Sequence, residues 1–113
     1  MLGQKPSAAV RVYTVWEPIL LTDQAPPLSF VLARMPDSRV QQYWDPDHVV
    51  AARMKKDARP PQPVQDCCEQ NDHLWDLAAV YPPGVTWTDR LPTATIFNGV
   101  VLDIVDQLAA AIK

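Results

Sequence analysis

The chain contains 113 residues, enough for one ordinary domain and too few for a multidomain assembly. Because 48% of the residues are apolar and 20% are charged, we expect a folded core, and the 12 prolines indicate long, stiff loops. The net charge of -3 is the opposite of the basic balance that phosphate backbones select, so nucleic acid is not expected as a partner.

Targeting signals and cysteine usage bear on location. Residues 1–9 hold one lysine and no following apolar run, and so lack the pattern of a secretory signal. No later apolar run approaches the roughly 20 residues that cross a bilayer. The two cysteines, Cys67 and Cys68, are adjacent and cannot link distant elements as the disulfides of secreted proteins do. We therefore expect a soluble, cytoplasmic protein without membrane contact, folded as one domain over residues 1–113 with residues 1–9 flexible.

The first half of the chain predicts a strand followed by helices. Residues 10–17, VRVYTVWE, are rich in β-branched and aromatic side chains, which favours a strand that ends before Pro18. A short helix is expected over residues 28–35. After it, the i, i+3, i+4 spacing of three apolar residues predicts a helical turn that directs them toward the core: Val40, Tyr43 and Trp44.

A second helix is predicted from about Asp45 to Asp57. The sequence Asp45-Pro46-Asp47 offers a carboxylate cap and a proline in the first turn, and lysines occupy the last turn, where the helix dipole favours positive charge. The following RPPQP at residues 59–63 cannot continue a helix, because proline restricts itself and the preceding residue to extended backbone. We expect a surface linker reaching to about Asp66.

The second half predicts strands and a final helix. Residues 73–81, HLWDLAAVY, form the most continuous apolar run and predict a strand buried on both faces, with a helix as the alternative. Two β-branched runs separated by Asn98-Gly99 predict a hairpin turn at that pair. Asp103 is expected to cap a C-terminal amphipathic helix with one apolar stripe, made of Val101, Ile104, Val105, Leu108 and Ile112.

The order of these elements is βα(α)β followed by ββα. A helical crossover brings two successive strands into parallel arrangement, while a hairpin adds antiparallel edges. The sequence therefore predicts an α/β fold with one mixed β-sheet and helices on both faces.

One segment near the C-terminus resembles a known family. Residues 91–99, LPTATIFNG, are similar to the part of thioredoxin-like proteins in which a cis-proline and a threonine lead into an apolar strand. Trp16 stands after the first strand, where redox-active members carry W-C-x-x-C. The resemblance covers most of the chain from Val10 onward. It implies a thioredoxin-like fold and a cis Leu91-Pro92 bond.

The family's dithiol is missing from this position. Glu17 stands where the attacking cysteine would be and Leu20 where the resolving cysteine would be, and neither can supply a thiolate. The connection from Pro82 to Leu91 also looks too short for the helix that many members place there. The chain thus resembles small bacterial thioredoxin-like proteins that keep the fold without the dithiol.

The resemblance implies a non-redox binding or accessory protein with an unidentified small molecule or protein as ligand. Open α/β sheets place ligands at the carboxyl ends of their strands, so a crevice is expected near Trp16, Glu17, Leu91 and Pro92. Trp87, between two threonines, is expected to be exposed and to contribute to binding. A homodimer whose interface is formed by exposed aromatic side chains is an alternative that the sequence leaves open.

Cys67 and Cys68 carry the alternative function. Two neighbouring thiols can exchange with disulfides or bind a soft metal, which would make the protein a thiol-dependent oxidoreductase or a soft-metal-binding protein. His73 lies near enough in sequence to be a ligand or a base. Against this, cysteines are often simply buried, and two Cys and two His without a spaced CxxC do not form a typical zinc site. No metal and no cofactor are therefore expected, and whether the protein is an enzyme stays open.

Overall fold

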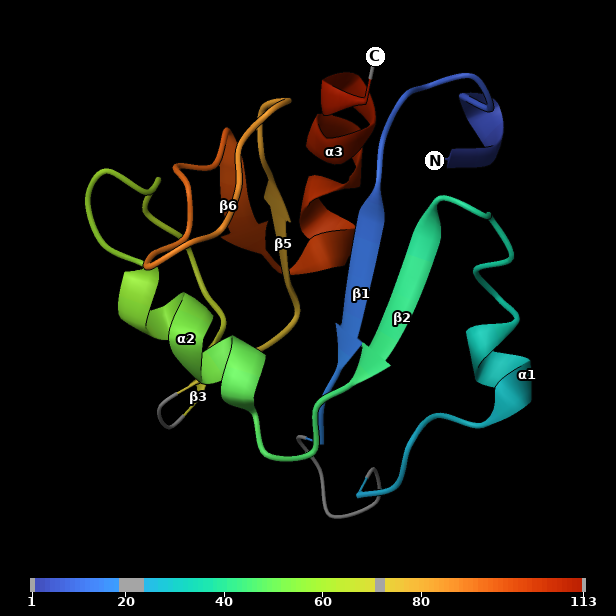
Figure 1. Ribbon diagram of the computed structural model, residues 1–113, viewed down its shortest axis with the longest axis horizontal. Helices are drawn as coiled ribbons and strands as arrows, with labels where there is room; N and C mark the ends of the chain where they lie inside the picture. Colours follow the sequence, from blue (N-terminus) through green and yellow to red (C-terminus); the bar gives the residue numbers. More distant parts are fainter. Residues whose placement is uncertain (1, 19–23, 71–72, 113) are drawn as a thin grey trace. The chain divides into compact units, whose positions relative to one another are not determined.

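The computed structural model describes residues 2–18, 24–70 and 73–112, and Figure 1 shows their ribbon. The chain divides into two units, the first made of Met1–Val50 with Ile112–Lys113 and the second of Ala51–Ala111. Within the described ranges, no helix has the length and apolar character needed to cross a membrane. Helices and short strands follow one another along the chain, so the predicted α/β class is confirmed, while the prediction of one domain stays a prediction.

The first unit is built on two parallel strands, which lie side by side in Figure 1. Strands β1 (Val12–Trp16) and β2 (Val40–Trp44) pair over their whole length, with Trp16 opposite Trp44. The crossover between them carries α1 (Ser29–Leu32), because parallel neighbours need a long connection. The predicted first strand is confirmed, and the helix predicted over residues 28–35 forms as a single turn.

The helical turn predicted for Val40, Tyr43 and Trp44 is wrong, because these residues lie in β2. Exposure alternates along β2, so Tyr43 is 50% exposed instead of facing the core. Its ring centroid lies 6.4 Å from that of Tyr13, which is also exposed. Over only five residues, the same apolar positions fit both the spacing of a helix and the alternation of a strand. Pairing with β1 decides between the two, and the sequence of residues 40–44 gives no sign of that pairing.

Arg39 binds the backbone of the segment before β1. This segment includes the short helix η1 (Leu2–Gln4). Its guanidinium donates to Asp37, at 2.9 Å from Nε and 2.6 Å from Nη2. The hydrogen bonds from Arg39 lower the pKa of Asp37 to about 2. The same guanidinium donates at 2.9–3.2 Å to three backbone carbonyl oxygens, those of Leu2, Lys5 and Ala8. The flexibility predicted for residues 1–9 stays a prediction.

Helix α2 (Val49–Asp57) follows β2 and begins four residues after Asp45, so Pro46 precedes the helix and does not lie in its first turn as predicted. The Asp45 carboxylate accepts the backbone N–H groups of Val49 and Val50, at 2.9 and 2.8 Å. Its predicted capping role is therefore confirmed, since these N–H groups have no partner within the helix. The last turn carries Lys55 and Lys56 as expected.

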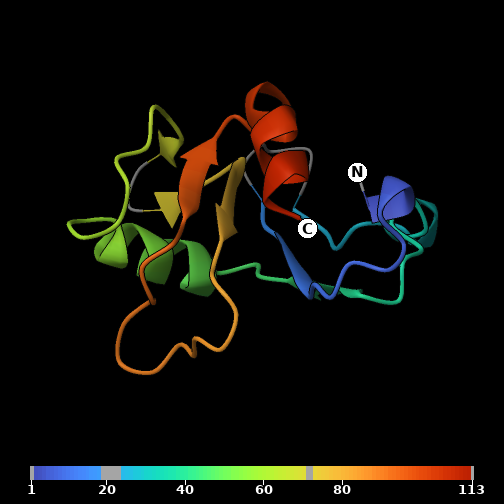
Figure 2. The ribbon, with the colours of Figure 1, turned by 90° about the horizontal axis from the view of Figure 1, so that it is seen from above.

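The second unit contains two antiparallel strand pairs. Strands β3 (Glu69–Gln70) and β4 (His73–Leu74) form the smaller pair. The larger pair joins β5 (Leu77–Val80) to β6 (Ile96–Gly99), which run side by side in opposite directions in Figure 2. The predicted strand over residues 73–81 thus forms in two pieces, because Asp76, at φ 49°, breaks it.

The predicted hairpin turn at Asn98-Gly99 is wrong. Both residues lie inside β6, where Asn98 pairs with Ala78 and Gly99 with Leu77, and neither has a positive φ. A Cβ at Gly99 would overlap the Asp76 carbonyl oxygen and lie 2.6 Å from Cys68 Sγ. Glycine is needed here for close approach of other atoms rather than for a turn.

The C-terminal segment forms η2 (Val101–Ile104) and then α3 (Val105–Ala111). Asp103 is not the cap, because it lies inside η2 and Val100 precedes that helix. The apolar stripe is confirmed at its centre, where Ile104 and Leu108 are buried. Four other buried residues of the unit pack together as a hydrophobic cluster: Leu74, Leu91, Ala94 and Phe97.

Two predictions tied to the resemblance are wrong. Among the described residues, the parallel pair and the antiparallel pairs form separate two-stranded sheets instead of one mixed sheet. Among residues 2–18, 24–70 and 73–112 the cis peptide bonds are Pro60-Pro61 and Gly99-Val100, so Leu91-Pro92 is trans. The α/β class therefore holds, the mixed sheet and the cis Leu91-Pro92 bond are not found among the described residues, and the thioredoxin-like assignment stays a prediction.

Candidate functional site

The loop after α2 carries Cys67 and Cys68 and is anchored by a buried glutamine. Gln62 is 5% exposed; its Nε2 donates to the Pro92 carbonyl at 2.7 Å and its Oε1 accepts the Ala94 N–H at 2.8 Å. The Gln62 amide thus donates to one backbone carbonyl and accepts from one backbone N–H of residues 92–94, as the backbone of a neighbouring strand would. The predicted surface linker is wrong at this residue, because a polar side chain saturated by backbone groups can be buried.

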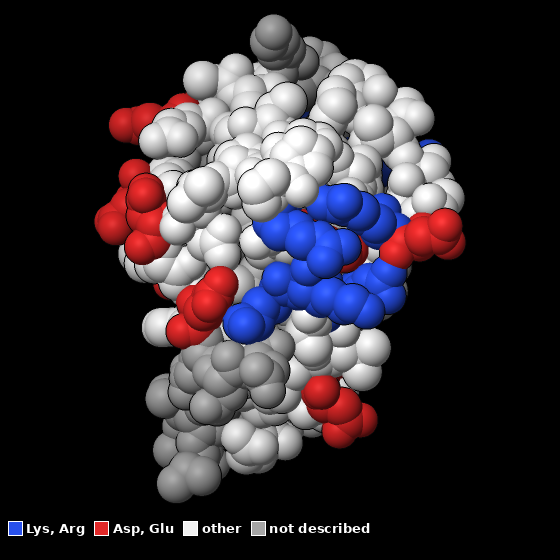
Figure 3. Space-filling view, turned by 90° about the vertical axis from the view of Figure 1, so that its left-hand side faces the viewer, with Lys and Arg blue, Asp and Glu red and all other residues white. Residues whose placement is uncertain are grey.

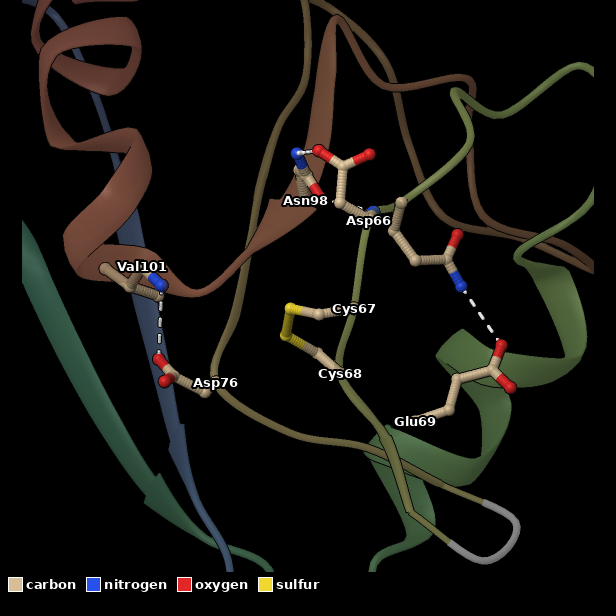
Figure 4. The surroundings of a disulfide bond; sticks show 8 residues. Asp66, Cys67, Cys68, Glu69, Asp76, Asn98 and Val101 are labelled. Atoms are coloured by element: carbon tan, nitrogen blue, oxygen red, sulfur yellow. Dashed lines mark hydrogen bonds between the residues drawn. A yellow bond between two sulfur atoms is a disulfide. The ribbon is translucent and has the colours of Figure 1, made fainter.

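A pair of reciprocal hydrogen bonds fixes the backbone directly before the cysteines. The Asp66 N–H donates to Asn98 Oδ1 at 2.8 Å, and Asn98 Nδ2 donates to Asp66 Oδ2 at 3.0 Å. Figure 4 shows Asn98 on β6 and Asp66 on the neighbouring loop, with their side chains facing one another. Asn98 therefore serves to hold this loop against the strand, a role that its position in an Asn-Gly pair does not suggest.

Cys67 and Cys68 are joined by a disulfide. Cys68 is 7% exposed, whereas Cys67 is only partly buried. The Cys68 backbone adopts φ 86°, the left-handed region that non-glycine residues seldom occupy, and its carbonyl oxygen accepts the Trp75 N–H at 3.0 Å. Together with Gly99, whose missing side chain makes room for Cys68 Sγ, these contacts place one sulfur inside and leave its partner nearer the surface.

The disulfide forms part of the wall of an open hollow of about 330 Å³, which is lined by Gln65, Asp66, Cys67, Cys68 and Glu69. Gln65 Nε2 donates to Glu69 Oε1 at 3.1 Å, so the residues on either side of the cysteines are also linked. Two carboxylates in this wall give it negative charge. Such a site disfavours approach by an anion and favours a neutral or cationic molecule.

The first unit contains a separate pair of titratable groups. Glu17 follows β1, and its Oε2 lies 3.3 Å from Nδ1 of His48, which follows β2. The Glu17 side chain is 11% exposed and that of His48 is 24% exposed. Glu17 thus lies at the carboxyl end of a strand, as predicted, and it can exchange a proton with the imidazole. The sequence did not predict this pair, because residues 40–44 were expected to be helical.

The other predicted binding residues are found in both units. Trp16 is in the first unit, and its Nε1 donates to Gln42 at 3.0 Å. In the second unit Leu91 is buried, with its N–H bound to Asp57, and the Pro92 carbonyl is bound by Gln62. Trp87 is 42% exposed, as expected. Leu91 and Pro92 thus have structural partners, and a shared crevice stays a prediction. Leu20 lies outside the described residues.

Comparison with protein-family models, curated proteins and solved structures gave no match. A functional proposal for this chain therefore depends on the geometry of its own residues.

Proposed function

We propose that Cys67 and Cys68 form a reversible disulfide–dithiol pair, and that the protein is a thiol-dependent oxidoreductase. The observation that carries this proposal is the bonded pair in the wall of an open hollow, with Gly99 making room for the inner sulfur. We also propose the cytoplasmic location that the sequence predicts. Disulfides in that compartment are usually transient and serve catalysis or redox sensing.

The reaction needs a dithiol as reductant. One thiolate of the reductant attacks Cys67 Sγ, the S–S bond breaks, and Cys68 leaves as a thiolate that takes up a proton. The second thiol of the reductant loses its proton and attacks the reductant's first sulfur, which is bonded to Cys67 in the mixed disulfide. This attack releases Cys67 as a thiolate, which is then protonated. The reductant becomes a disulfide and the protein gains two electrons and two protons. Cys67 is the site of attack because Cys68 is 7% exposed.

The test is reduction of the folded protein in dithiothreitol redox buffers, followed by alkylation and mass spectrometry. We expect a single reversible transition in which both cysteines become alkylated together while the circular dichroism spectrum stays folded. Insulin reduction should be lost in Cys68→Ser, which keeps Cys67 but cannot close the disulfide. The proposal fails if the pair resists reduction until the protein unfolds, or if Cys68→Ser turns over insulin as fast as the parent.

The negative wall of the hollow adds a second, sharper measurement. We expect 2-mercaptoethanol, which attacks as a singly charged thiolate, to open the disulfide faster than 2-mercaptoethanesulfonate, whose thiolate carries two negative charges, because Asp66 and Glu69 repel the sulfonate. Added salt should narrow the difference between the two rates, since it screens exposed charges. A Glu69→Gln variant should narrow it as well. Equal rates at low salt would show that the carboxylates do not act on an incoming thiol.

A non-redox binding protein of the thioredoxin-like type is the second candidate. Its support is the strand–helix–strand order of the first unit, the strand–strand–helix order that ends the second, and Glu17 beside His48 at the carboxyl ends of parallel strands. The ligand would be a small molecule or a protein. Screening the parent and Glu17→Gln against a metabolite library by thermal shift tests it, and a ligand that stabilises both equally would exclude Glu17 from binding.

A further inference from the structure

Basic side chains gather on one face of the second unit. Figure 3 shows Lys and Arg grouped on the side of this unit that carries α2, in a chain whose net charge is -3. Three arginines come from segments that meet at Asp57: Arg53 lies in α2, Arg59 follows it, and Arg90 directly precedes Leu91, whose N–H binds Asp57. We call these three residues the arginine cluster.

The buried carboxylate of Asp57 orients one residue of the arginine cluster. Its side chain is 2% exposed and its Oδ2 accepts the Leu91 N–H at 2.9 Å and Arg53 Nε at 3.4 Å. The hydrogen bond from Leu91 lowers the pKa of Asp57, and the bond from Arg53 and the charges of Arg53 and Arg59 lower it further, although burial acts in the opposite direction. The carboxylate therefore stays ionised and orients Arg53.

Backbone carbonyl groups position two of the guanidinium groups. Arg53 Nη2 donates to the Asp89 carbonyl oxygen, and Arg90 Nη2 donates to the Pro60 carbonyl oxygen at 3.0 Å. A carbonyl fixes the direction of a guanidinium without neutralising its charge. Within the described part of the chain, the Asp89 carboxylate forms no ion pair with the cluster, and the ion pair between Arg53 and Asp57 is the only one that the cluster makes.

The cluster also has unused hydrogen-bond donors. Among the described residues, the Arg59 guanidinium donates no hydrogen bond, and Nη1 of Arg53 and of Arg90 donates none. Arg59 is exposed and the Arg53 side chain is 40% exposed, so a ligand in solution can reach these groups. Planar guanidinium groups bind phosphate and carboxylate oxygens through paired N–H groups.

We propose that Arg53, Arg59 and Arg90 bind a phosphate group in its dianionic form. Among the described residues Arg53 is ion-paired with Asp57 whereas Arg59 and Arg90 form no ion pair, and a dianion balances the charges of these two, whereas a single carboxylate balances one. The phosphate is either free inorganic phosphate or the ester group of a small organic molecule. A long polyanion is a poorer fit, because the rest of the chain is negatively charged.

The test is a titration of the oxidised protein with inorganic phosphate and with phenyl phosphate at constant ionic strength, followed by calorimetry and by the NMR signals of the arginine side-chain N–H groups. We expect the signals of the cluster to shift with phosphate and not with acetate. Arg59→Gln should weaken binding about tenfold, because charge-assisted hydrogen bonds are lost. Arg11→Gln removes an equal charge from the first unit and should bind like the parent.

Tighter binding of phenyl phosphate would identify an ester as the ligand, and equal binding would identify the phosphate group alone. The proposal is overturned if phosphate binds no more tightly than acetate, or if Arg59→Gln retains the parent's affinity. Arg59 donates no side-chain hydrogen bond in the described structure, so its substitution should leave the fold intact, which circular dichroism checks. Neither result depends on the redox state of Cys67 and Cys68.

Discussion

Gly99 provides a direct measure of how closely β6 approaches the disulfide. A Cβ added there would overlap the Asp76 carbonyl oxygen and lie 2.6 Å from Cys68 Sγ, and neither neighbour is the free end of a flexible side chain. Overpacking a buried site costs about 1–3 kcal/mol, and a clash with backbone belongs at the upper end of that range. We expect Gly99→Ala to lower the free energy of unfolding by about 3 kcal/mol.

Urea denaturation of the oxidised protein followed by circular dichroism gives this number. Gly3→Ala is the matched control, because a Cβ at Gly3 meets nothing within 4 Å; it should change stability by less than about 0.5 kcal/mol. Replacing both cysteines by alanine removes one of the two clashes, so Gly99→Ala should cost about 1 kcal/mol less in that background. A Gly99→Ala protein as stable as the parent would refute the close packing of β6 on Cys68 and Asp76.

Three further predictions concern other parts of the protein. Asp57→Ala should lower the free energy of unfolding by about 2 kcal/mol in a urea titration, since it leaves the buried Leu91 N–H without its acceptor, and Asp103→Ala, an exposed change, should not. The lowered pKa of Asp37 means that its ionised form stabilises the fold at pH values above about 3.8 and that this stability is lost as the pH falls toward about 2; Asp37→Asn should flatten the acid limb of a plot of melting temperature against pH, and an unchanged limb would contradict the pairing with Arg39. If the protein forms a homodimer through Trp87, which is 42% exposed, Trp87→Ala should sediment as a smaller species than the parent, and identical sedimentation would exclude that interface.

The sequence predicted elements whose signals are local. Residues 12–16 are rich in β-branched and aromatic side chains and form β1. Asp45 caps α2 because a carboxylate before a helix finds its N–H groups within a few residues, whatever the rest of the chain does. Ile104 and Leu108 are buried because a helix with one apolar side places that side against a core.

Elements that depend on a distant partner were predicted wrongly. Residues 96–99 pair with β5 instead of with the residues that follow them, so the Asn-Gly pair became part of a strand. Residues 40–44 became a strand because β1 was available for hydrogen bonding. Gln62, polar and between prolines, is buried because the backbone of residues 92–94 satisfies its amide.

The candidate sites likewise contain residues that local sequence identifies and contacts that depend on distant residues. From the sequence alone, Cys67 and Cys68 were identifiable as the only thiols and Glu17 as a carboxylate at a strand end, because residue type and local order suffice for both. Only the tertiary structure placed His48 beside Glu17, brought Arg90 into one cluster with Arg53 and Arg59, and put Gly99 against Cys68. These arrangements join residues up to 37 positions apart, as between Arg53 and Arg90, and such proximity arises from the packing of whole elements, which no short stretch of sequence encodes.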